Sequence, residues 1–170
     1  MLVVAGKFEP EKTLGLITKY YAGIPRPTRK LQNPYTVEPV QDGERQVILR
    51  RNGDVGAVAA IYHTCPGSHE DFPALDALEH VLTNQPSGRL YQALVESGLA
   101  ASVGGNAFGW AEPGVAEFSA EVRIEQDPQP VLTKMVEVLE GFAAKPVTAE
   151  EVERAKASRM KAIELNLTRS

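Results

Sequence analysis

The sequence is poor in the residues and patterns from which several common kinds of functional site are built. Its 170 residues include one cysteine, Cys65, which excludes an internal disulfide and a zinc cluster made of cysteines. No apolar run approaches the roughly 18 residues that a membrane-spanning helix needs. The first residues have no basic start and no apolar stretch long enough for a secretory signal. The net charge is -4, so no basic surface predicts binding to nucleic acid or to an anionic membrane.

What the chain contains is typical of a folded domain. Apolar residues make up 43% of it and charged residues 24%, which is the usual mixture for a soluble globular protein. We therefore expect a soluble protein, cytoplasmic or periplasmic. The chain starts with an apolar run and stops inside a helix-like run with no stop signal, so we expect a piece of a longer protein.

The first 44 residues differ in character from the rest. Residues 2–6, LVVAG, predict a short strand, and EPEKTLGLITKYYAGIP predicts a helix that Gly23 and Pro25 end. Residues 24–44 contain four of the twelve prolines, which is typical of an extended linker. We predict a strand-helix remnant of a longer protein over residues 1–23, a linker over 24–44, and a second domain over 45–170.

The second domain alternates pairs of strands with pairs of helices. Asn52-Gly53 between two strand-like runs predicts a hairpin, and Thr148 with Glu151 predicts a helix start with a capping box. In residues 114–124, Val115, Glu117, Ser119 and Glu121 alternate with apolar residues, which is the period of a strand. The predicted strands are 45–51, 55–64, 99–110 and 114–124, and the predicted helices are 74–85, 87–97, 130–142 and one from Thr148. This order indicates an α+β fold, an antiparallel sheet with helices packed on one face.

The segment DALEH, residues 76–80, is the strongest candidate for chemistry. With His in place of Asp76 it would read His-x-x-Glu-His, the inverted motif of zinc peptidases. A catalytic zinc needs three protein ligands, and this helix offers one imidazole, His80. The simpler interpretation is a solvated helix face on which Asp76 and His80 make a weak i,i+4 pair. We assign no metal ligand and no catalytic residue.

The other candidate groups carry weaker signals. His63 ends a strand, where a half-buried ring is common, and His69 lies in a loop beside the start of the next helix. Cys65 precedes a proline, and nothing orients it toward a base. Asn166-Leu167-Thr168 matches a glycosylation pattern but lies in a helical run, so we discount it.

The whole chain resembles the insulinase/pitrilysin-type zinc peptidases. VVAGKFEPEKTLGLITKYYAGIP is similar to the end of their first domain, and the rest is similar to their second, inactive domain. The stretches that carry this resemblance are NPYTVEPVQDGERQVILRR, YHTCPGSHEDFPALDALEHVL, SGRLYQALVESGLAASVGG, PGVAEFSAEVR and VTAEEVERAKASRMKA.

The resemblance implies a fold, a place for the zinc and a set of partners. It implies a mitochondrial processing peptidase-like metallohydrolase fold, with zinc in the first domain of the parent protein and no cofactor in this fragment. The implied partners are a peptide substrate and the rest of the same chain or a homologous subunit. Active members place an Arg and a Tyr on the substrate from a late domain. Arg89 stands at the Arg position, whereas Ala101 replaces the Tyr, so Arg89 is either a substrate contact or only a structural residue at a helix start.

Three functions remain open at this point. The first is a non-catalytic domain of a zinc endopeptidase that forms part of the chamber enclosing the peptide. The second is a domain of a catalytically dead homologue, acting as a scaffold or partner subunit of an active peptidase. The third is an unrelated module that binds a small molecule, which predicts a preformed apolar pocket. In each case we expect the isolated chain to be inactive toward peptides.

Overall fold

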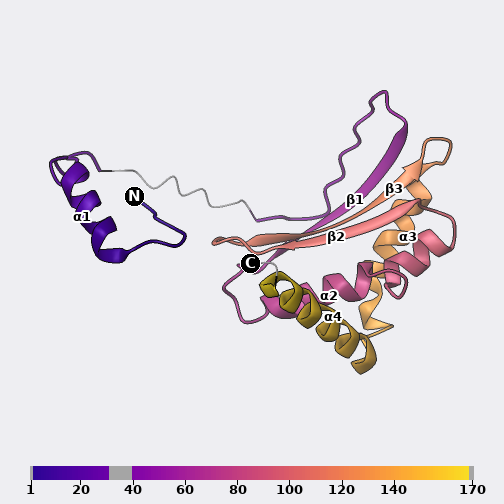
Figure 1. The fold of residues 1–170 in the computed structure, drawn as a ribbon. Helices are drawn as coiled ribbons and strands as arrows, with labels where there is room; N and C mark the ends of the chain where they lie inside the picture. Colours follow the sequence, from indigo (N-terminus) through magenta and orange to yellow (C-terminus); the bar gives the residue numbers. More distant parts are fainter. Residues whose placement is uncertain (1, 31–39, 169–170) are drawn as a thin grey trace. The chain divides into compact units, whose positions relative to one another are not determined.

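The computed structural model describes residues 2–30 and 40–168, and its internal contacts divide the chain into two units, residues 1–48 and 49–170 (Figure 1). The predicted linker over residues 24–44 falls partly on residues 31–39, which lie outside the described residues. The finer division into the end of one domain, a linker and a second domain therefore stays a prediction.

The first unit contains the helix α1, Pro10–Tyr21, where a helix is predicted. Pro10 stands at the start of the helix, where its missing N–H costs nothing. The predicted strand at residues 2–6 is wrong, because these residues form no strand and the side chain of Val3 is exposed. A strand needs a partner for its backbone groups, and the described part of this unit provides none.

The second unit is an α+β domain, as predicted. Its elements in chain order are β1 (Val55–Thr64), α2 (Phe72–Thr83), the π-helix η1 (Tyr91–Glu96), β2 (Ser102–Phe108), β3 (Gly114–Arg123), α3 (Pro128–Glu140), the 3-10 turn η2 (Gly141–Ala143) and α4 (Ala149–Thr168). The helix α2 begins two residues earlier than predicted. The helix predicted over residues 87–97 is largely the π-helix η1. None of the helices that the structure describes is long and apolar enough to cross a membrane.

The three strands form one antiparallel sheet in the order β1-β3-β2. The hairpin predicted around Asn52-Gly53 is wrong, since residues 45–51 form no strand and Val47 is 80% exposed. The strand β1 instead pairs along its length with β3, so that Val58 faces Ala120. The apolar residues of 45–51 fit a strand, but strand propensity alone does not choose a partner.

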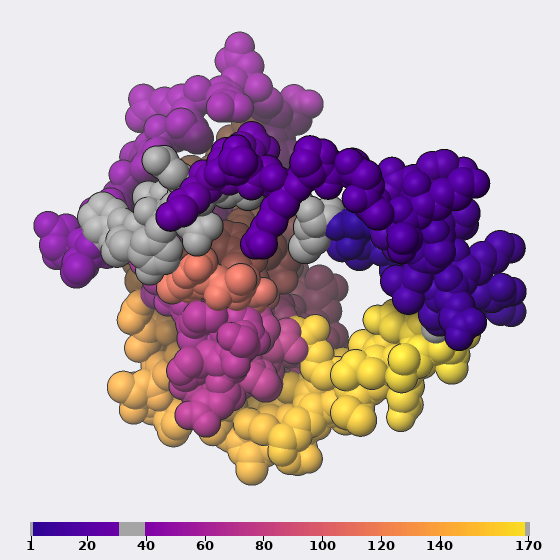
Figure 2. Space-filling model, turned by 90° about the vertical axis from the view of Figure 1, so that its left-hand side faces the viewer, coloured from indigo at the N-terminus to yellow at the C-terminus, as the bar shows by residue number. Residues whose placement is uncertain are grey.

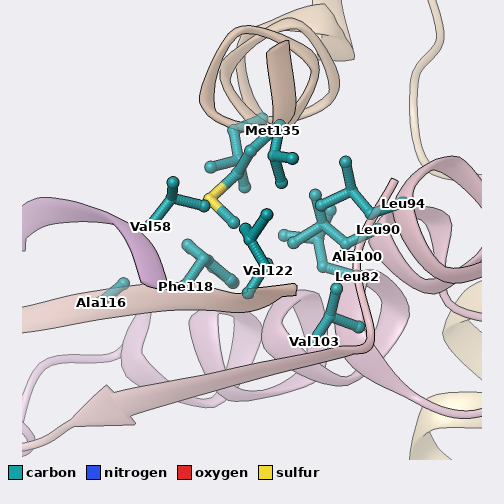
Figure 3. Packing of buried hydrophobic residues seen from close by; sticks show 13 residues of the cluster. Val58, Leu82, Leu90, Leu94, Ala100, Val103, Ala116, Phe118, Val122 and Met135 are labelled. Atoms are coloured by element: carbon teal, nitrogen blue, oxygen red, sulfur yellow. The ribbon is translucent and has the colours of Figure 1, made fainter. Parts of the chain in front are cut away.

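The helices of this unit lie on one face of the sheet (Figure 1). The side chains of β1 and β3 that point to this face have even numbers, as the period of two requires. Figure 3 shows Met135 of α3 reaching from its helix toward Val58 and Val122. Leu82, Leu90 and Leu94 complete the core and are almost completely buried. Each buried leucine stabilises the fold by about 1.5–3 kcal/mol.

The other face of the sheet bears no helix of this unit (Figure 1). We call it the open face; it consists of the odd-numbered residues of β1 and β3 and the even-numbered residues of β2. Along β1 its side chains are exposed, whereas the even-numbered ones are half-buried or buried. The sheet therefore has one face that forms the core and one that bears no helix among the described residues of this unit.

Candidate functional site

The carboxylates of the DALEH segment bind an arginine. Arg159 of α4 donates from one Nη2 atom to Asp76 Oδ1 and to Glu79 Oε2, the latter at 3.0 Å. Glu79 also accepts a hydrogen bond from Thr83 Oγ1 at 2.6 Å. Glu79 is well shielded, with 13% of its side chain exposed, while Asp76 and Arg159 are each 40% exposed. These contacts fasten α2 to α4 and place a cation between the two acidic groups.

This arrangement corrects the interpretation of DALEH as a solvated face with an Asp76–His80 pair. The described residues show no such pair, and the face lies against α4. Asp76 pairs with Arg159 because a guanidinium is always charged and donates several hydrogen bonds in a fixed geometry. The sequence offered no signal for this contact, because the partners are 83 residues apart.

The imidazole of His80 lies beside a small hollow between α2 and α4. Its Nε2 atom is buried and has no hydrogen-bond partner among the described residues. The hollow has a volume of about 10 Å³, and its other lining residues are Val81, Asn84, Ser87, Glu151 and Arg154. That space suits one water molecule, for which the surrounding polar groups supply partners.

The remaining candidates do not gather into a site. His69 Nδ1 accepts from the backbone N–H of Asp71 at 3.2 Å, beside the start of α2. His63 is exposed on the open face rather than half-buried, because it points away from the helices. Cys65 is a free cysteine in the loop that follows β1. Within residues 2–30 and 40–168, no three His, Cys, Asp or Glu side chains stand close enough to hold a metal ion.

Arg89 is the centre of a polar cluster that ties η1 to the start of α4. Its Nε and Nη2 atoms donate to the two carboxylate oxygens of Glu151, both at 2.7 Å. The same guanidinium donates to the carbonyl oxygens of Lys145 and Pro146, at 2.5 and 2.9 Å. It also lies 5.5 Å from the ring centre of Phe142, within cation–π range. The guanidinium of Arg89 thus makes its hydrogen bonds within the domain, and 19% of the side chain is exposed.

Glu151 accepts hydrogen bonds from both Arg89 and Thr148, and these bonds lower its pKa. The hydrogen bonds from Arg89, together with those from the backbone and hydroxyl of Thr148, lower the pKa of Glu151 to about 2. Glu151 raises the pKa of Arg89 in return. The backbone N–H of Glu151 donates to Thr148 Oγ1 at 3.3 Å, so the predicted capping box is confirmed. A substrate contact by Arg89 stays a prediction.

The open face carries two acidic residues on β3, Glu117 and Glu121. Glu117 lies at the centre of β3, between Ile61 of β1 and Asn106 of β2. Its side chain has no ion pair or hydrogen bond with any residue that the structure describes. Glu121, two residues along, accepts from Ser102 Oγ at 3.1 Å and has Arg123 as its neighbour on the same face. Glu117 is therefore the carboxylate without a nearby opposite charge on its own strand.

One end of the open face is aromatic. Phe108 lies opposite Val115, and its ring centre is 6.0 Å from that of Trp110, which is 54% exposed. The backbone of Trp110 is fixed, because its carbonyl oxygen accepts from Gly67 N–H at 2.9 Å. Gly67 and Gly109 touch so closely that a Cβ on either would lie 2.9 Å or less from the backbone of the other. We call Phe108, Trp110 and Val115 the aromatic end.

An apolar groove lies on the helix side of the sheet. Its volume is about 270 Å³, and a hydrogen bond of 2.8 Å from Tyr62 Oη to Glu140 Oε1 lies at its rim. The other residues that line it are Leu75, Leu78, Leu82, Ala116, Phe118, Leu139 and Phe142. This is the kind of pocket that the third interpretation predicts, but most of its wall is the edge of the domain core.

Comparison with known proteins defines the family. Residues 1–159 match the family model of the Peptidase M16 inactive domain. The inactive peptidase domain of a Bordetella parapertussis protein is 38% identical with a TM-score of 0.63, over 70% of this chain and 65% of that chain. A protease from Helicobacter pylori has a TM-score of 0.81 at 23% identity, over 95% of this chain and 40% of that chain, which shows a common fold.

A curated relative agrees with the family model. The zinc protease PqqE of Helicobacter pylori is 31% identical over 104 residues, which are 60% of this chain and 23% of that protein. The chain thus spans less than a quarter of this relative. The predicted resemblance to the inactive second domain of insulinase/pitrilysin-type zinc peptidases is confirmed, and the chain belongs to the Peptidase M16 inactive domain family.

Proposed function

We propose that this chain is a non-catalytic domain of a zinc metalloendopeptidase and that its open face forms part of the wall of a peptide-enclosing chamber. The observation that carries the proposal is the sheet itself, which packs helices on one face. The other face presents small and polar residues, the aliphatic residues Val55 and Ile61, and the aromatic end. Such a face suits transient contact with many peptides better than the tight packing of a permanent interface.

The helix side of the domain supports a non-catalytic role. The place where a zinc peptidase would carry its motif is used here to join α2 to α4 through Arg159. A guanidinium between Asp76 and Glu79 competes with any metal ion for the same oxygens. We propose that the zinc and the general base belong to another part of the parent protein, and that the partners are that part, or a homologous subunit, and the peptide.

Photo-crosslinking tests where a peptide lies. A peptide that carries benzoylphenylalanine is irradiated with the chain, and the crosslinked residues are mapped by mass spectrometry. We expect crosslinks on β2, β3 and Trp110. The alternative, a scaffold or partner subunit of an active peptidase, predicts that the open face takes no peptide, so crosslinks confined to the helix side would contradict the chamber proposal.

Hydrolysis by the chain alone is a second test. After loading with zinc, the chain should give no peptide turnover that a chelator abolishes, because no three His, Cys, Asp or Glu side chains among the described residues stand close enough to hold a zinc ion. Chelator-sensitive turnover of a fluorogenic peptide by the purified chain would contradict the proposal.

A further inference from the structure

We propose that the open face selects extended peptides in which a bulky apolar residue and a lysine or arginine stand two positions apart. The apolar residue lies on the aromatic end, and the basic residue lies beside Glu117. This inference rests on the proposed function and adds a specificity to it. It is carried by the row-by-row register of the sheet and by the pair of half-buried Phe108 and exposed Trp110.

The register places the aromatic end and Glu117 in neighbouring rows of the open face. Val115 and Phe108 form one row across the sheet, and Glu117 with Asn106 forms the next row on the same face. Rows two residues apart along a strand are separated by about 6.4–6.8 Å. An extended peptide that runs along the strands repeats its side chains on one side with the same spacing, so its residues i and i+2 match the two rows.

The aromatic end suits a bulky apolar side chain. Trp110 is 54% exposed, and its backbone is held by the hydrogen bond from Gly67 N–H to its carbonyl oxygen. Phe108 lies against it at 6.0 Å. Exposed aromatic side chains on a rigid frame are the groups that most often dominate binding energy at protein surfaces.

The charge of the face fits a cation at the next row. Glu117 is flanked by Ile61, Asn106 and Ser119, none of which carries a charge, and the next residue of β1 on this face is His63, opposite Val115. At the far end of the face Glu121 is accompanied by Arg123, which offsets part of its charge. A basic side chain is therefore attracted to Glu117, and an acidic one placed there meets a repulsive charge in the same position.

The small residues around Glu117 leave room for a peptide backbone. Ala59 of β1, Ser119 of β3 and Gly104 of β2 form the row on the other side of Glu117. A Cβ added at Gly104 would have only Ser119 Oγ nearby, at 3.8 Å. The side chains in this row are small, so a peptide can lie along the face without displacing large side chains.

Trp110 is the single tryptophan of the chain, so its fluorescence reports occupancy of the aromatic end directly. The capped peptide Ala-Phe-Ala-Arg-Ala is titrated into the chain, with calorimetry in parallel, and compared with Ala-Phe-Ala-Glu-Ala and with Ala-Phe-Arg-Ala-Ala. We expect saturable changes in Trp110 emission with the first peptide, at least about fivefold weaker binding of the acidic peptide, and weaker binding at high salt.

Variants separate charge from shape. Glu117→Gln should weaken binding of the arginine peptide by about three- to fivefold and should not weaken binding of the acidic peptide. Glu164→Gln, which removes the same charge from the exposed end of α4, is the matched control and should change nothing. Circular dichroism confirms that each variant is folded.

The outcomes distinguish this inference from the proposed function. Equal binding of the arginine and glutamate peptides, or no effect of Glu117→Gln, overturns the specificity while peptide binding to the face stands. Calorimetric binding with unchanged Trp110 emission overturns the assignment of the aromatic end. If no peptide binds, the specificity and the chamber proposal both fail for this face.

Discussion

At the scale of single residues, Arg159 determines what the DALEH segment does. Its guanidinium lies between Asp76 and Glu79, and Glu79 is 13% exposed. If Arg159 is removed, two like charges stay close together on one helix without a counter-charge. The segment is thus an anchor between two helices, and its stability depends on a residue far away in the sequence.

Arg159→Met should lower the free energy of unfolding by about 1–2 kcal/mol, because it keeps the stem and removes the charge from partly shielded carboxylates. Urea denaturation followed by circular dichroism measures the loss. Arg154→Met is the control, since Arg154 pairs with Glu150, which is 83% exposed, and such a pair contributes at most about 0.5 kcal/mol. Equal losses in the two variants would contradict the role given to Arg159.

Glu151 gives a second prediction at this scale, which concerns pH. Its pKa is lowered from an ordinary 4.5 to about 2 in the folded state, so its contribution is complete above pH 4.5 and is lost as the pH falls through 2. Glu151→Gln should cost roughly 2 kcal/mol at pH 6 and progressively less below pH 4. Glu150→Gln serves as the control. A cost that is the same at pH 6 and pH 2.5 would show that the charge of Glu151 is not what stabilises the start of α4.

At the scale of elements, local signals predicted the start of α4, whereas residues 2–6 and 45–51 do not form the predicted strands. The capping box of Thr148 and Glu151 is local, so the sequence alone reveals it. The alternation in β3 predicted that Glu117 and Glu121 share a face, and the register places both on the open face. By contrast, residues 2–6 and 45–51 have strand propensity, but whether a strand forms depends on a distant partner that propensity does not encode.

The α4 cap provides the prediction at this scale. Thr148→Ala should reduce the free energy of unfolding by about 1 kcal/mol, because the N–H of Glu151 loses its acceptor at the helix start. Thr148→Ser keeps the hydroxyl and should recover most of the loss. Thermal unfolding of the two variants measures the difference. An equal loss of unfolding free energy in both would mean that the methyl group contributes more than the hydrogen bond.

At the scale of the whole molecule, the two faces of the sheet differ in what they contact. The helix side holds the core and the anchors Arg89 and Arg159, and the open face offers the aromatic end and Glu117. Sequence periodicity predicted the division of faces. It did not reveal Trp110 as part of a site, because the contact of Gly67 with Gly109 that positions it joins two loops.

We propose that DALEH serves as a structural anchor between α2 and α4, through Arg159, and holds no catalytic zinc. The most direct measurement is the zinc content of the purified chain after zinc loading and desalting. We predict well under one zinc per chain, with no change on His80→Ala. One equivalent of retained zinc that is lost on His80→Ala would contradict the account, because it would make DALEH a metal site.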